Sequence, residues 1–194
     1  MPEFTPGTHL LTIGHSNHSP EHFRGLLSNH GIEALVDVRS WPHSRYVDWA
    51  NRPQIADLVR SAGARYLFMG GELGGRPEAV DCYDGAGHVL YARVAASEGF
   101  RAGIDRLRRG VGRYRVALMC SEEDPSTCHR RLLIAKVLLE EGWTIGHIRG
   151  DGRCEVETEP IALSAGSLFE DEEGLWRSSL SVSRSRAPRI SSAA

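Results

Sequence analysis

The feature of this 194-residue sequence that most constrains its fold is a repeated alternation of short apolar runs with segments of helical periodicity. Short apolar runs bounded by turn signals are typical of strands buried on both faces, and intervening helices are typical of parallel sheets. The sequence therefore predicts a single three-layer α/β domain, with a mostly parallel sheet of about five strands and helices on both faces. The strands are expected at residues 9–13, 32–38, 65–69, 114–119 and 143–148.

The segments between these runs carry signals for the beginnings and ends of helices. Ser19 and Pro20 suit an N-cap and a first helical position, and Gly31 suits a helix end. Further helices are expected near residues 51–62, 91–109 and 128–141. Residues 70–87 contain six glycines, so we expect a long loop there.

The character of the chain changes after Gly152. Residues 1–152 are predicted to form the α/β domain, and residues 153–176, which mix acids with a few apolar positions, a C-terminal extension. Residues 177–194 are rich in serine and carry four arginines but no acid, so we expect disorder. An arm that binds nucleic acid is the alternative for this tail.

Composition excludes some classes of protein. The formal net charge of −2 provides no broad basic surface for non-specific nucleic-acid binding. No run approaches the ~20 apolar residues that span a bilayer, and the first residues lack the pattern of a signal peptide. We therefore expect a cytoplasmic protein without membrane contact and with reduced thiols at Cys82, Cys120, Cys128 and Cys154. The sequence does not define an oligomeric state.

The segment Met119–Arg131 is the most informative one for function. Cys120 ends the fourth predicted strand, and the carboxyl ends of parallel strands line the ligand crevice of α/β sheets. Cys128 begins the next predicted helix, where the helix dipole favours a thiolate, and His129 can act as an acid or a base. Cys120 is the first candidate nucleophile. The alternative for both cysteines is burial as small core side chains.

Two other segments end on the same predicted edge. His15 and Ser16 follow the first strand, and Asp37 and Arg39 close the second, pointing to the same side because they alternate. An ion pair of Asp37 with Arg39 or Arg45 would order the following loop. The functional alternative is an anion clamp made by these arginines.

Together these residues predict a pocket for a small anionic or nucleotide-like substrate. The catalytic candidates are Cys120, Asp37, Glu122, His15, Cys128 and His129. The substrate-binding candidates are Arg39, Arg45, Arg130, Ser16 and Ser44. The aromatic residues Trp41, Tyr46 and Trp49 can stack on a base or cap the core.

No cofactor or metal is predicted from the spacing. Seven residues separate Cys120 from Cys128, unlike the close ligand pairs of structural zinc motifs. Zinc remains an alternative in which His15 joins the two cysteines and His129. The segment also lacks the loop of a cysteine phosphatase, because Ser126 follows Cys120 where an arginine is required.

Several short stretches together resemble the domain-of-unknown-function family 488 over residues 9–150. They are T-I-G-H-S (12–16), V-D-V-R (36–39), P-H-S-R (42–45), L-G-G (73–75), M-C-S-E-E-D-P-S-T-C-H-R (119–130) and H-I (147–148). The resemblance implies a cytoplasmic α/β protein. It also implies that the family's characteristic positions include His15, Asp37, Arg39, Arg45, Cys120, Glu122, Cys128, His129 and Arg130, without assigning their roles.

Three functional hypotheses follow. The first is an enzyme, a hydrolase or transferase, acting on a small anionic substrate through the pocket described above. The second is a nucleoside or nucleic-acid base-processing enzyme in which Asp37 or Glu122 is essential and no thiol reacts. The third is a non-catalytic module that binds phosphate or nucleic acid.

Overall fold

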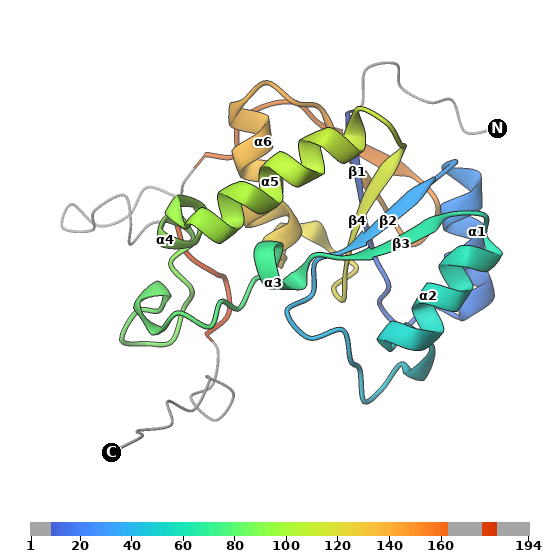
Figure 1. The fold of residues 1–194 in the computed structure, drawn as a ribbon, viewed down its shortest axis with the longest axis horizontal. Coiled ribbons are helices and arrows are strands. Elements are labelled where there is room, and N and C mark those ends of the chain that lie inside the picture. The colour runs from blue at the N-terminus through green and yellow to red at the C-terminus, as the bar shows by residue number, and fades with distance from the viewer. Residues whose placement is uncertain (1–8, 163–175, 182–194) are drawn as a thin grey trace.

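The computed structural model describes residues 9–162 and 176–181. Its centre is one six-stranded sheet with the strand order β3-β2-β4-β1-β5-β6 (Figure 1). Adjacent strands in the sheet are parallel except β6, which is antiparallel to β5. The strands are β1 (Leu10–Gly14), β2 (Ala34–Asp37), β3 (Arg65–Phe68), β4 (Val116–Cys120), β5 (Ile145–Ile148) and β6 (Cys154–Glu157).

The five predicted strands are confirmed, and the sixth was not predicted. β6 has the sequence C-E-V-E and is largely exposed, so it lacks the apolar run that marks the others. It pairs with β5 after a tight turn in which Gly152 has a φ of 87°. The position of β6 is therefore set by its backbone hydrogen bonds to β5. It lies in the segment predicted as a C-terminal extension.

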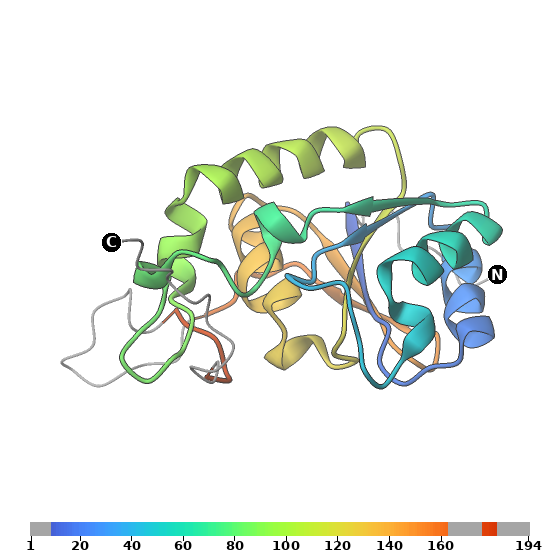
Figure 2. The ribbon, with the colours of Figure 1, turned by 60° about the horizontal axis from the view of Figure 1, so that its bottom comes forward.

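Helices cover both faces of the sheet, as predicted (Figures 1 and 2). One face packs against α1 (Pro20–Asn29) and α2 (Arg52–Ser61), whose buried side chains include Phe23, Leu27, Ile55 and Val59. The other face packs against a second group of helices, with Phe100, Ile104, Leu107 and Leu138 in its core. This second group comprises α3 (Gly70–Leu73), α4 (Tyr91–Ala96), α5 (Glu98–Val111) and α6 (Lys136–Glu140).

Two of the predicted helices are interrupted. The segment 91–109 forms α4 and then α5, because the Ser97 hydroxyl accepts a hydrogen bond from Phe100 N (3.2 Å) and caps a new helix. The segment 128–141 begins as a π-helix, η4 (Arg130–Ala135), which continues into α6. π-helical turns occur often at functional sites. The predicted loop 70–87 also contains short helical turns, α3 and η2 (Val80–Cys82).

A short segment near the C-terminus returns to the domain. The Trp176 indole donates a hydrogen bond to Leu132 O (2.7 Å) in the π-helix, and Tyr91 N donates to Trp176 O (2.8 Å). Arg177 forms a β-bridge with Leu90. Of the tail predicted to be disordered, Arg177 and Ser178 thus contact Leu90 and Val89, just before α4. The nucleic-acid arm was considered for residues 177–194, of which residues 182–194 lie outside the described residues. In the described part of the chain, no helix is long and apolar enough to cross a membrane.

Candidate active site

The carboxyl ends of three adjacent strands bring the predicted site residues together. β4 lies between β2 and β1, so residues that follow these strands meet at one edge of the sheet. His15 N donates to Cys120 O (2.9 Å), and Val38 N donates to Met119 O (3.1 Å). Backbone hydrogen bonds between neighbouring strands therefore extend to this edge of the sheet, where the chain carries His15, Arg39 and Cys120.

At this edge two thiols, an imidazole and a carboxylate converge. We call Cys120, Cys128, His129 and Glu122 the Cys–His cluster. Both thiols donate to Glu122 Oε2, from Cys120 Sγ at 3.0 Å and from Cys128 Sγ at 3.2 Å. His129 Nδ1 lies 3.7 Å from Cys120 Sγ and 3.9 Å from Cys128 Sγ. The cysteine and histidine ligand atoms all lie within 4.8 Å of one another, a geometry that can hold a metal ion.

The four residues of the cluster differ in their exposure to solvent. Cys120 and Cys128 are buried, with 4% and 2% of their surface exposed. His129 is half-buried, and Glu122 is exposed. Glu122 is therefore the residue of the cluster that is most exposed to solvent.

Backbone contacts fix the position of the cluster. The second ring nitrogen of His129, Nε2, lies 3.0 Å from Val38 O and donates a hydrogen bond to it, so Nδ1 faces the thiols. Gly75 lies against this ring, because a Cβ at that position would be 2.5 Å from His129 Cγ. Arg130 donates to Glu122 O and, at 2.6 Å, to Glu123 O, which holds the loop after β4.

Burial shapes the protonation of the cluster. Burial, followed by the neighbouring Cys120 thiol, raises the pKa of Cys128 well above its usual value. This direction is opposite to the one expected from a helix dipole acting on Cys128. Burial acts to raise the pKa of Glu122, but hydrogen bonds from the Cys120 thiol, a backbone N–H and the Cys128 thiol, with the nearby His129, together lower it. For His129 burial acts to lower the pKa, but contact with Cys128, the Glu122 charge and the hydrogen bond to Val38 O together raise it.

Asp37 and Arg39 form a buried ion pair beside the cluster. Arg39 donates to Asp37 through Nε (2.9 Å) and Nη2 (2.6 Å), and Nη2 also donates to Ala50 O (2.8 Å). The Tyr66 hydroxyl donates to Asp37 Oδ2 at 2.7 Å. Asp37 is fully buried and Arg39 is 4% exposed. This geometry is that of the ion pair expected to order the loop after β2. An anion clamp would need a guanidinium that faces solvent, and the Arg39 guanidinium is buried.

Arg130 also faces inward, because its buried guanidinium binds the backbone carbonyls of Glu122 and Glu123. Ser44 and Arg45 lie in the loop after β2, away from the contacts of the cluster. The Ser44 hydroxyl accepts hydrogen bonds from Tyr46 N (3.2 Å) and Val47 N (3.0 Å), which closes a turn. Arg45 is exposed. Of these predicted binding residues, only Arg45 presents its charge to solvent.

His15 links the ion pair to the end of β1. Its Nδ1 donates to Ser16 O (3.0 Å), and its Nε2 accepts from Arg39 Nη1 (3.2 Å), so the ring is neutral. Ser16 follows with a φ of 44°, in the left-handed region. Burial and the Arg39 charge lower the pKa of His15 from 6.5 to about 4, against the opposing effect of Asp37 and Glu122.

This environment predicts a loss of stability in mild acid. The unfolded chain takes up the His15 proton below pH 6.5, whereas the folded protein does so only near pH 4. The free energy of unfolding should therefore fall by roughly 2–3 kcal/mol from this group as the pH drops from 6.5 to 4. Urea denaturation across this range should show a shallower pH dependence for His15→Asn than for the wild type. Equal slopes for the two proteins would contradict the prediction.

Sequence reasoning did not assign two residues near the cluster, Arg76 and Tyr91, to the site. Arg76 follows Gly75, is exposed, and lies with its guanidinium 5.9 Å from the ring centre of Trp41. Trp41 is itself 51% exposed. Tyr91 is buried, and its pKa is raised by burial, by the two thiols and by Glu122, whereas Arg76 lowers it. The sequence signal for Arg76 was its position after the glycine-rich stretch.

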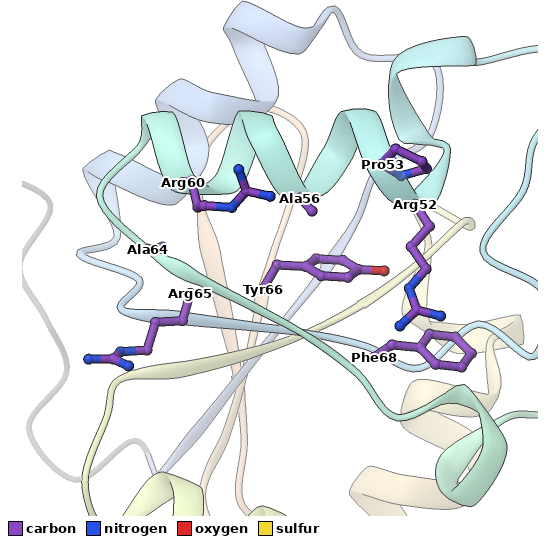
Figure 3. A pocket seen from close by; sticks show the side chains of 8 residues that line it. All are labelled: Arg52, Pro53, Ala56, Arg60, Ala64, Arg65, Tyr66 and Phe68. Carbon is purple, nitrogen blue, oxygen red and sulfur yellow. The ribbon is translucent and has the colours of Figure 1, made fainter.

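A hollow lies between α2 and β3, apart from the Cys–His cluster (Figure 3). It is open, with a volume of about 600 Å³. Arg52 lies over the Phe68 ring at 4.7 Å, and the Tyr66 hydroxyl reaches Asp37 from this side. None of its lining residues belongs to the Cys–His cluster. They are Arg52, Pro53, Ala56, Arg60, Ala64, Arg65, Tyr66 and Phe68.

Fold and site together define an α/β protein with a mainly parallel sheet and a thiol–imidazole–carboxylate cluster at its carboxyl edge. The chain belongs to the family described as domain of unknown function DUF488, whose model matches residues 19–137. The predicted membership is confirmed over a shorter range than residues 9–150. No curated protein and no solved structure matches the chain.

Proposed function

We propose that this protein is an enzyme, a hydrolase or transferase, that acts on a small anionic, nucleotide-like substrate at the carboxyl edge of its sheet. The observation that carries the proposal is the convergence of Cys120, Cys128, His129 and Glu122 within hydrogen-bond or near-contact distance. Such a gathering of reactive groups around one solvent-facing carboxylate is typical of catalytic centres.

The exposed rim supports an anionic substrate. Arg39 and Arg130 are engaged inside the protein, so Arg76 and Arg45 are the arginines of the predicted edge that face solvent. Arg76 lies next to Gly75, which contacts His129, and beside the exposed Trp41 ring. A guanidinium can bind phosphate while an indole stacks on a base. We assign Arg76 and Trp41 to substrate binding and Glu122 to proton transfer.

The free cysteines support a reducing compartment. The structure leaves Cys82, Cys120, Cys128 and Cys154 without disulfides. Free thiols are typical of cytoplasmic proteins. We therefore place this enzyme in the cytoplasm.

A ligand panel tests the binding role of Arg76. Nucleoside monophosphates should bind the wild type in calorimetry more tightly than the matching nucleosides, which lack the phosphate. Loss of one charge-assisted contact in Arg76→Ala should weaken binding by about 1.5–3 kcal/mol, roughly tenfold or more. Arg24→Ala, an exposed arginine on α1, is the control and should bind as the wild type does. Equal affinity in Arg76→Ala would contradict the assignment.

Turnover of the bound ligand tests the catalytic role of Glu122. Products are followed by mass spectrometry after incubation with the ligands that bind. Glu122→Gln keeps the shape of the side chain but cannot accept a proton, and general-base loss should slow turnover by about 10²–10⁴-fold. Binding that depends on Arg76, with no turnover by the wild type, would contradict the enzymatic proposal. It would indicate that the protein is a non-catalytic binding module.

A further inference from the structure

We infer that the Cys–His cluster binds a Zn²⁺ ion through Cys120 Sγ, Cys128 Sγ and His129 Nδ1, which leaves the fourth position for a water molecule or a substrate oxygen. The inference adds a cofactor to the centre proposed above, but it stands on ligand geometry and does not depend on any turnover. It also differs from the zinc alternative considered from the sequence, in which His15 was the additional ligand.

The spacing of the three ligand atoms is compatible with zinc. With Zn–S bonds of about 2.3 Å and Zn–N or Zn–O bonds of about 2.1 Å, neighbouring sulfur and nitrogen or oxygen ligands lie about 3.6 Å apart. His129 Nδ1 lies 3.7 Å and 3.9 Å from the two sulfurs. Glu122 Oε2 lies 3.0 Å and 3.2 Å from them. Small side-chain movements bring Cys120 Sγ, Cys128 Sγ and His129 Nδ1 to bonding distance of one ion.

The contacts behind His129 are those of a metal ligand. A zinc-binding histidine usually donates its other ring N–H to a carboxylate or a backbone carbonyl, which fixes the tautomer. His129 Nε2 has this contact with Val38 O at 3.0 Å. Because Gly75 has no side chain, the His129 ring fits against it. A Cβ at Gly75 would lie 2.5 Å from His129 Cγ. The ring is therefore locked with its Nδ1 lone pair toward the two sulfurs.

The donor set and its charge favour zinc. Two thiols with one imidazole suit zinc rather than the hard cations magnesium and calcium. Two arginines of the same edge do not neutralise the cluster: Arg39 pairs with Asp37, and Arg130 binds backbone carbonyls. A divalent cation supplies the missing positive charge, and both thiols lose their protons when it binds.

The exposed position of Glu122 distinguishes this site from a closed structural one. Cys120, Cys128 and His129 form the inner three ligands, and Glu122 faces solvent. Three protein ligands with a replaceable fourth are typical of catalytic zinc, which can polarise a substrate oxygen or activate a water molecule. With zinc bound, Cys120 and Cys128 act as ligands rather than as free nucleophiles.

Metal analysis of the purified protein tests the inference. Elemental analysis of wild type prepared with zinc should give about one zinc per chain. Protein stripped with a chelator should rebind Zn²⁺, and Co²⁺ in its place should give the near-ultraviolet charge-transfer band of cobalt–thiolate bonds. Cys120→Ser and Cys128→Ser should lose both signals. Cys82→Ser, a buried cysteine outside the cluster, should keep them. Glu122→Gln should retain zinc, because the three ligands are Cys120, Cys128 and His129.

Alkylation of the unmutated protein covers the case in which a serine variant fails to fold. Zn²⁺ added to the stripped protein should protect Cys120 and Cys128 from iodoacetamide, and the exposed Cys154 should label equally with and without the metal. Absence of zinc uptake by the wild type, or full uptake by both folded serine variants, overturns the inference. Zinc uptake by a protein without turnover would contradict the proposed function and leave the metal site standing.

Discussion

Asp37→Asn is expected to cost about 3–5 kcal/mol of stability, which would unfold a large share of a marginally stable domain. Asparagine keeps the shape of the side chain, but it leaves the buried Arg39 guanidinium without its counter-charge. The cost of an unpaired buried charge is much greater than the net value of the pair itself. Urea denaturation at neutral pH measures the change in the free energy of unfolding.

The chain contains a matched control for this prediction. Asp57 pairs with Arg60 at 2.6 Å, the same distance as the Asp37–Arg39 contact, but both partners are about 70% exposed. Water screens such a pair, so Asp57→Asn should change stability by less than about 1 kcal/mol. The double variant Asp37→Asn/Arg39→Met should recover much of the loss, because it removes the uncompensated charge. Similar small effects of Asp37→Asn and Asp57→Asn would show that burial does not govern this pair.

Gly14→Ala is the second substitution with a large expected effect. A Cβ at Gly14 would lie 1.9 Å from Glu122 O and 2.8 Å from Glu123 Cα, so backbone has to move. We expect a loss of about 3 kcal/mol or more, at the upper end of overpacking effects. Because the displaced carbonyl lies in the segment that joins Cys120 to Cys128, zinc uptake should also fall. Thermal unfolding and elemental analysis measure the two effects.

A glycine in open space provides the comparison for Gly14→Ala. Gly25 lies within α1, and a Cβ there meets nothing within 4 Å. Alanine is the better helix former, so Gly25→Ala should stabilise the protein by about 0.5–1 kcal/mol. The two substitutions add the same methyl group. Stability changes of opposite sign would show that the close approach of backbone at Gly14 causes the loss. A stability loss below about 1 kcal/mol for Gly14→Ala would contradict this account.

The sequence by itself was sufficient to predict the layered α/β architecture. Buried strands such as β1 and β4 are continuous apolar runs, and the caps at Ser19 and Gly31 mark the first helix. These signals are local, so they can be recognised in the sequence without knowing which elements pack together. The sequence also placed Cys120, Glu122, Cys128 and His129 in one segment at a strand end, because chain proximity limits how far apart they can lie.

Tertiary structure alone decided what each of these side chains faces. β6 exists because β5 offers it hydrogen bonds, although its own residues are exposed. Arg39 turns inward because Asp37, Ala50 and His15 provide its partners, whereas Arg45 and Arg76 are exposed. The periodicity of apolar residues in a sequence indicates which side chains of a helix or strand are buried. The pairing of charges and the convergence of ligand atoms depend on contacts between distant segments, which only the folded chain provides.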